Sequence, residues 1–71
     1  MNVAILDDDP YQRRLLTMLA ESGGHRVHAY ETGESLLEAL DAGDGPDLLL
    51  LDWVMPGMSG EAVLGALRAR P

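Results

Sequence analysis

The chain has 71 residues, enough for one small domain, and its 46% hydrophobic content is typical of a globular protein. A formal net charge of −7 argues against binding to nucleic acid or to an anionic membrane, because both require a basic surface. No cysteine is present, which excludes disulfides, thiol chemistry and cysteine-based zinc sites. No apolar run is longer than Leu48–Leu51 and no secretory signal is visible, so we expect a cytoplasmic protein.

The first predicted unit is a strand followed by a helix. Val3–Leu6 is apolar and ends abruptly at an aspartate triplet, which predicts a buried strand opening onto an acidic loop. Asp9 is a suitable N-cap, Pro10 fits a first helical turn, and Gln12 completes a capping box. The apolar residues that then recur at helical spacing are Leu15, Leu16 and Leu19. Gly23 and Gly24 are expected to end this helix.

The second predicted unit begins at Arg26–Tyr30, which is rich in strand formers and is expected to be partly exposed. Thr32 can cap the following helix, which ends at the glycine- and proline-rich segment 43–46. The expected inner face of that helix consists of Leu36, Leu37 and Leu40.

The third predicted unit starts with Leu48–Leu51, a continuous apolar run typical of a central parallel strand covered on both faces. Residues 53–58 are expected to form a loop, and Ser59 can cap a third helix that begins at about Gly60. Its expected inner face consists of Val63, Ala66 and Leu67. The order βαβαβα with short connections predicts an α/β fold with a parallel sheet.

Aspartates end two of the predicted strands: Asp7 and Asp8 follow the first, and Asp52 follows the third. Open parallel sheets bind ligands outside the carboxyl ends of their strands. Carboxylates gathered there repel one another, so we expect a divalent cation, and all-oxygen ligands favour Mg²⁺. Such an ion would also neutralise a phosphoryl group arriving at Asp52, which can act as a carboxylate nucleophile.

Two stretches, Ile5–Pro10 and Asp47–Gly60, resemble response-regulator receiver domains of two-component signalling. The second is the more specific, because an apolar strand ending in Asp is followed by Met-Pro and then Gly. The resemblance implies a flavodoxin-like receiver fold, truncated here to βαβαβα with a parallel sheet of order 2-1-3. Residues 1–71 would be a partial receiver domain, with the first three of the family's βα units present and the fourth and fifth absent.

The same resemblance implies phosphorelay signal transduction, with Asp52 as the phosphoacceptor and a sensor histidine kinase or a phosphotransfer protein as the donor. The chain would then accept phosphate rather than act as an enzyme. It further implies that Asp8 ligates Mg²⁺ directly and that Asp7 contacts the ion through water. Asp52 and the backbone carbonyl of Val54 would be the remaining protein ligands. The family's lysine belongs to the absent units, and this chain contains no lysine. Whether this chain can accept a phosphoryl group is therefore a separate question from whether it descends from receiver domains.

Several alternatives remain open from the sequence. A strand order of 2-1-3 leaves Leu48–Leu51 as an unpaired edge, which predicts a homodimer or swapped assembly, or else a fragment of a longer gene product. The chain could be a phosphorylation-incompetent module that presents its first helix to a kinase or another receiver. A haloacid dehalogenase-type Mg²⁺-dependent phosphatase, with Asp7 as nucleophile and Asp9 as acid, fits less well because Tyr11 stands where that motif has Thr or Val. Arg13 and Arg14 on the first helix either face a kinase partner or, as is usual for exposed arginines, solvate a helix face. His25 and His28 are interpreted as surface or sheet-packing residues without a catalytic role.

Overall fold

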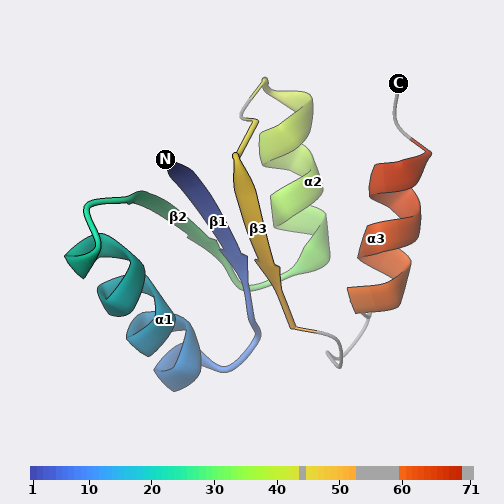
Figure 1. Cartoon of the computed structure of the whole chain (residues 1–71). Helices are drawn as coiled ribbons and strands as arrows, with labels where there is room; N and C mark the ends of the chain where they lie inside the picture. Colours follow the sequence, from blue (N-terminus) through green and yellow to red (C-terminus); the bar gives the residue numbers. More distant parts are fainter. Residues whose placement is uncertain (44, 53–59, 70–71) are drawn as a thin grey trace.

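A computed structural model describes residues 1–43, 45–52 and 60–69 of the chain. Strands and helices alternate along it, as predicted (Figure 1). The strands are β1 (Asn2–Leu6), β2 (Arg26–Tyr30) and β3 (Leu48–Leu51), and the helices are α1 (Pro10–Ser22), α2 (Gly33–Asp41) and α3 (Gly60–Arg68). None of the helices in these ranges is long and apolar enough to cross a membrane.

The three strands form one parallel sheet in the order β2-β1-β3, which confirms the predicted 2-1-3 arrangement. In the register, Leu6 of β1 lies beside Tyr30 of β2 on one side and Leu51 of β3 on the other. The central strand is therefore β1, and its residues 3–6 are at most 3% exposed. All three strands consequently end at the same edge of the sheet.

Helices cover both faces of the sheet, with α1 on one side and α2 and α3 on the other (Figure 1). Ala4 and Leu6 project toward α2 and α3 and form the core cluster with Leu36 and Val63. Side chains alternate along a strand, so Val3 and Ile5 project toward α1. The expected inner faces of α2 and α3 are confirmed, since Leu40 and Leu67 pack against this cluster while Leu37 and Ala66 are half-buried.

Local signals define the helix ends as expected. The carboxylate of Asp9 accepts hydrogen bonds from the N–H groups of the first turn of α1, and Pro10 occupies its first position. Gly24 follows this helix with φ of 86°, a conformation that favours glycine. Thr32 caps α2 by accepting a hydrogen bond from the N–H of Ser35.

One expectation about burial is wrong. Leu48–Leu51 is not covered on both faces: Leu48 is 46% exposed, the other leucines are half-buried, and no second strand within the described ranges pairs with β3. The position at the sheet edge explains this, because α1 packs mainly on β1 and β2 and, within the described ranges, one side of β3 has no neighbouring strand. Of the three leucines that recur at helical spacing in α1, Leu15 and Leu19 are exposed and Leu16 is partly buried, since contact with the sheet covers only one narrow face of the helix.

Candidate carboxylate site

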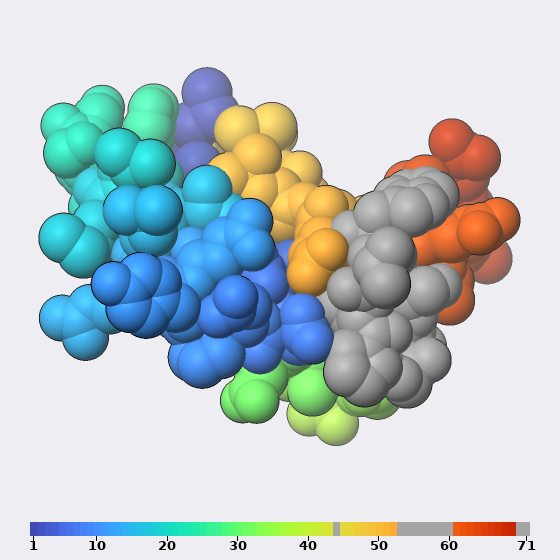
Figure 2. All heavy atoms as spheres, turned by 90° about the horizontal axis from the view of Figure 1, so that it is seen from below, coloured from blue at the N-terminus to red at the C-terminus, as the bar shows by residue number. Residues whose placement is uncertain are grey.

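The candidate site lies where β1 and β3 end side by side. The N–H of Asp52 donates to the carbonyl oxygen of Leu6 at 2.9 Å, and the N–H of Asp7 donates to the carbonyl oxygen of Tyr30 at 3.1 Å. Both bonds continue the parallel ladders one residue beyond the strands. Viewed from below, the blue segment after β1 and the orange end of β3 are neighbours on the surface (Figure 2).

Three carboxylates meet at this edge. Asp7, Asp8 and Asp52 each offer one oxygen, and these oxygens all lie within 4.8 Å of one another. Asp7 is only 2% exposed, whereas Asp8 and Asp52 are half-buried and reachable from solvent. The sequence therefore predicted correctly which aspartates converge, and the structure adds that they differ in accessibility.

Two hydrogen bonds fix the buried member of the cluster. The carboxylate of Asp7 accepts the backbone N–H of Asp9 at 2.9 Å, and the carbonyl oxygen of Asp7 accepts Nη1 of Arg13 at 2.9 Å. The capping-box expectation is wrong on this point, because the N–H of Asp9 pairs with Asp7 and not with Gln12. Sequence reasoning also missed this contact of Arg13, which was interpreted as facing a kinase partner or solvating a helix face. No helical spacing links residues 7 and 13, because Asp7 precedes the helix, so the sequence contained no signal for this contact.

Asp9 lies outside the cluster. Its Oδ1 accepts the N–H groups of Tyr11 at 2.9 Å and Gln12 at 3.4 Å, so this carboxylate caps α1. The phosphatase alternative required Asp9 as an acid next to Asp7. Because the Asp9 carboxylate is engaged in capping α1, the phosphatase alternative lacks its proposed acid.

The cluster raises the affinity of the Asp8 carboxyl for a proton. Partial burial raises the pKa of the Asp8 carboxyl above its ordinary value of 3.8, and a side-chain hydrogen bond with Asp52 and the charges of Asp52 and Asp7 raise it further. A hydrogen bond between two carboxyl groups requires a proton on one of them. Negative charges held this close therefore favour either a proton or a cation between them.

The donor set suits a hard divalent cation. All three side chains offer carboxylate oxygens, the ligands that Mg²⁺ prefers, and no sulfur or imidazole is among them. Val54, whose backbone carbonyl was expected as a further ligand, lies outside the described residues, as do the expected Met-Pro loop and the Ser59 cap. Gly60 begins α3, as predicted.

The fold and the site together define a parallel α/β unit with a trio of aspartates at the carboxyl edge of its sheet. The sequence model of the response regulator receiver domain matches residues 3–71. The chain belongs to the response regulator receiver domain family.

Individual relatives agree with this assignment. The chain is 40% identical over 58 residues to protein PilH of Pseudomonas aeruginosa, covering 82% of this chain and 47% of PilH. It is 40% identical over 68 residues to the DNA-binding transcriptional regulator NtrC of Escherichia coli, covering 96% of this chain and 14% of NtrC. The chain thus spans about half the length of PilH and a much smaller part of NtrC.

Solved structures share the fold. The N-terminal domain of a response regulator receiver protein from Methanoculleus marisnigri matches with a TM-score of 0.92 and 36% identity, over 99% of this chain and 56% of that one. The response regulator TrrA of Thermotoga maritima, solved with Mg²⁺ and BeF, matches with a TM-score of 0.87 and 36% identity, over 94% of this chain and 57% of TrrA. TrrA has also been solved in complex with the histidine kinase ThkA; that match has a TM-score of 0.88 and 33% identity, over 99% of this chain and 60% of that one.

Proposed function

We propose that residues 1–71 supply the first three βα units of a receiver domain and that Asp52 accepts a phosphoryl group in a phosphorelay. The observation that carries this proposal is the convergence of three carboxylate oxygens within 4.8 Å at the carboxyl edge of the sheet. Membership of the receiver family supports it. In this role the chain is a phosphoacceptor and not an enzyme that turns over an external substrate.

Asp7, Asp8 and Asp52 would hold Mg²⁺, with the backbone carbonyl of Val54 as a further ligand. Bound Mg²⁺ supplies positive charge that offsets the charge of the incoming phosphoryl oxygens. The half-buried position of Asp8 suits a direct ligand, whereas Asp7, which is 2% exposed, suits contact through a water molecule. The TrrA structure with Mg²⁺ and BeF supports the choice of ion.

In the transfer step, a carboxylate oxygen of Asp52 forms a bond to phosphorus while the phosphorus–nitrogen bond of a phosphohistidine breaks. The electron pair of that bond stays on the imidazole nitrogen, which can then take up a proton. The strand ladder through Leu6 holds the backbone of Asp52, so the nucleophile needs little reorganisation. Arg13 helps to position Asp7 by donating a hydrogen bond to the carbonyl oxygen of Asp7.

The donor would be a sensor histidine kinase or a phosphotransfer protein. The complex of TrrA with the kinase ThkA supports a kinase partner. A positively charged or mixed docking surface on the donor would suit a chain with a net charge of −7.

Incubation with acetyl phosphate and Mg²⁺, followed by intact-mass measurement, tests the proposal. We expect the wild-type chain to gain the mass of one phosphoryl group, and Asp52→Asn to gain none. Asp9→Asn is the matched control, because it removes a neighbouring carboxylate that belongs to the helix cap. An adduct that persists in Asp52→Asn, or that requires Asp9, would contradict the assignment.

A second candidate function is that of an interaction module that does not accept phosphate. The exposed apolar residues of α1 favour it, with Leu15 52% and Leu19 61% exposed. The absence of an adduct on the folded wild-type chain, together with binding to a histidine kinase that Leu15→Lys abolishes, would establish this alternative.

We also propose that the outer edge of β3 pairs with another copy of the chain. Its backbone groups on that side have no strand partner within the described ranges, and an apolar edge of this kind favours pairing.

A further inference from the structure

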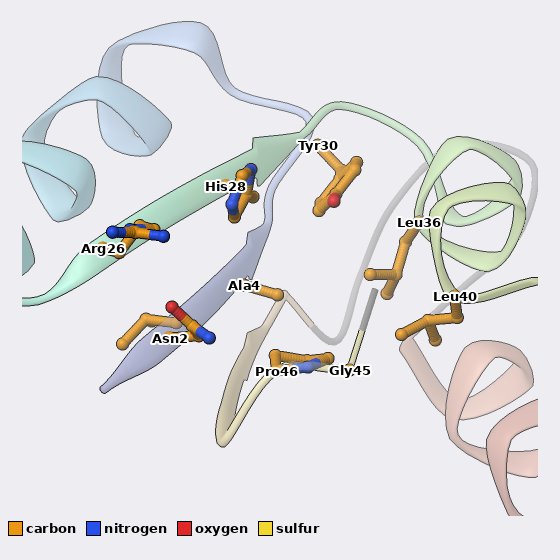
Figure 3. A pocket seen from close by; sticks show the side chains of 10 residues that line it. Asn2, Ala4, Arg26, His28, Tyr30, Leu36, Leu40, Gly45 and Pro46 are labelled. Atoms are coloured by element: carbon orange, nitrogen blue, oxygen red, sulfur yellow. The ribbon is translucent and has the colours of Figure 1, made fainter. Parts of the chain in front are cut away.

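A cavity of about 190 Å³ lies between β1, β2 and α2 (Figure 3). It opens toward the amino-terminal ends of the strands, where Asn2, Arg26 and Pro46 lie. The carboxylate cluster is at the carboxyl ends of the same strands. The cavity is therefore a feature separate from the proposed phosphorylation site.

Strand alternation builds the polar wall of this cavity. Arg26, His28 and Tyr30 are every second residue of β2, so their side chains project from one face, and all three line the cavity. The register places Arg26 beside Asn2 and His28 beside Ala4 of β1. Side chains with hydrogen-bonding groups thus form a row along one side of the cavity (Figure 3).

The opposite wall is apolar. Leu36 and Leu40 are one helical turn apart on α2 and reach toward the sheet, and Pro46 closes the end nearest β3 (Figure 3). Leu36 and Ala4 also belong to the buried core cluster, so this wall is a continuation of the core. A ligand there would contact hydrocarbon on one side and polar groups on the other.

The charge of the lining is opposite to that of the chain. The protein has twelve acidic and five basic residues, yet the described residues that line the cavity include Arg26 and His28 and no aspartate or glutamate. Within the described ranges the guanidinium of Arg26 forms no ion pair or side-chain hydrogen bond. An anion entering the cavity would therefore meet a guanidinium that has no ion pair within the described ranges and whose planar fork matches a carboxylate.

The volume of the cavity limits the size of a ligand that it can hold. An apolar cavity of about 150 Å³ holds one benzene molecule, whereas sites for drug-sized ligands begin at about 300 Å³. We propose that this cavity binds a small monocarboxylate whose hydrocarbon part is one ring or a short branched chain. Its carboxylate contacts Arg26 at the rim, and its hydrocarbon part lies against Leu40 and Pro46, the partly exposed apolar residues of the lining. Inorganic phosphate would leave the apolar wall unfilled, and a peptide segment would be too large.

Benzoate is the probe for the first test, and benzyl alcohol is its neutral counterpart of similar size. In a ¹H–¹⁵N NMR titration at constant ionic strength, benzoate should shift the amide signals of residues 2–4 and 26–30 in a saturable manner. Benzyl alcohol should bind at least about tenfold more weakly, because it cannot form the charge-assisted hydrogen bond with Arg26. Equal affinity for the two compounds, or shifts confined to residues elsewhere, would overturn the proposal.

Two variants with matched controls test separately whether benzoate binding requires the charge of Arg26 and the open space of the cavity. Arg26→Gln should weaken benzoate binding about tenfold, while Arg68→Gln, which removes an exposed arginine on α3, should not. Gly45→Leu adds a side chain at a residue that lines the cavity, in open space and without a strained φ, and we expect it to weaken benzoate binding by occupying part of that space. Gly65 on α3 is equally open, so Gly65→Leu is its control.

The NMR spectra of the variants also report folding. Folded Gly45→Leu or Arg26→Gln that binds benzoate as tightly as the wild type would overturn the proposal. If Gly45→Leu does not fold, Arg26→Gln decides the matter alone, because its side chain is exposed and its loss leaves the core intact.

Discussion

The backbone N–H of Asp52 donates a hydrogen bond of 2.9 Å to the carbonyl oxygen of Leu6. Leu6 ends β1 and Asp52 follows β3, so this bond extends the ladder between the two strands. It holds Asp52 beside Asp7 and Asp8, which directly follow Leu6 in the chain. The carboxylate cluster is therefore a product of strand pairing, and its geometry depends on the register of two strands that are distant in sequence.

Removal of one clustered carboxylate should weaken binding of Mg²⁺. We expect Asp8→Asn and Asp52→Asn each to lower the Mg²⁺ affinity at least about tenfold, or about 1.4 kcal/mol, because each removes a negative charge at close range. Isothermal titration calorimetry at pH 7 measures this effect. Asp9→Asn should bind Mg²⁺ almost as the wild type does, and an equal loss in that control would contradict the site.

The stability of the metal-free chain should respond to pH through Asp8. Because the folded chain raises the pKa of Asp8, the folded state binds its proton more tightly than the unfolded state does. The resulting stabilisation is fully present below the unfolded pKa and is lost as the pH rises through the folded pKa. Urea unfolding in EDTA between about pH 4 and pH 7 should therefore show wild type losing stability relative to Asp8→Asn.

Addition of Mg²⁺ should oppose this loss, because the cation binds the deprotonated carboxylates and stabilises the folded state most at neutral pH. If the difference between wild type and Asp8→Asn in EDTA stays constant with pH, the raised pKa of Asp8 is refuted.

The cap of α1 should contribute measurably to folding. Asp9→Ala removes the acceptor for the N–H groups of Tyr11 and Gln12, and we expect a loss of about 1 kcal/mol in the free energy of unfolding. Asn is an equally good N-cap, so Asp9→Asn should lose less. Urea denaturation of the two variants measures both values. Equal destabilisation would mean that the side-chain oxygen is not what stabilises the helix.

The edge of β3 should mediate self-association. Analytical ultracentrifugation of the wild-type chain should show a dimer that increases with concentration, and Leu48→Lys should reduce it, because lysine on an edge strand discourages pairing. Leu48 is already 46% exposed, so the substitution should leave the core intact. Leu19→Lys on α1 is the control, since Leu19 is 61% exposed on another surface. A wild-type chain that remains monomeric at high concentration, or a dimer disrupted only by Leu19→Lys, would exclude the edge of β3 as the dimer interface.

Local chemistry made much of the fold predictable. Asp9 with Pro10, the glycines that follow α1, and Thr32 act within a few residues of their own position, through caps and backbone conformations. The bounds of the elements could therefore be predicted from the sequence. The meeting of Asp52 with Asp7 and Asp8 was also predictable, because parallel strands end at a common edge.

Burial was less predictable, because it depends on neighbours that are distant in sequence. Four consecutive leucines are typical of a covered strand, yet Leu48–Leu51 lies at an edge and is only half-buried. Leu15 and Leu19 have helical spacing, but no neighbour covers that side of α1 within the described ranges.

The sequence by itself determined the order of the elements, the receiver family and the aspartates that gather at the sheet edge. Only the tertiary structure decided that Asp7 is the buried member, that Arg13 holds its carbonyl oxygen, and that Arg26 faces an apolar wall across a cavity. The physical reason is that caps and turns depend on neighbouring residues, whereas burial, proton affinity and cavities depend on how strands and helices pack together.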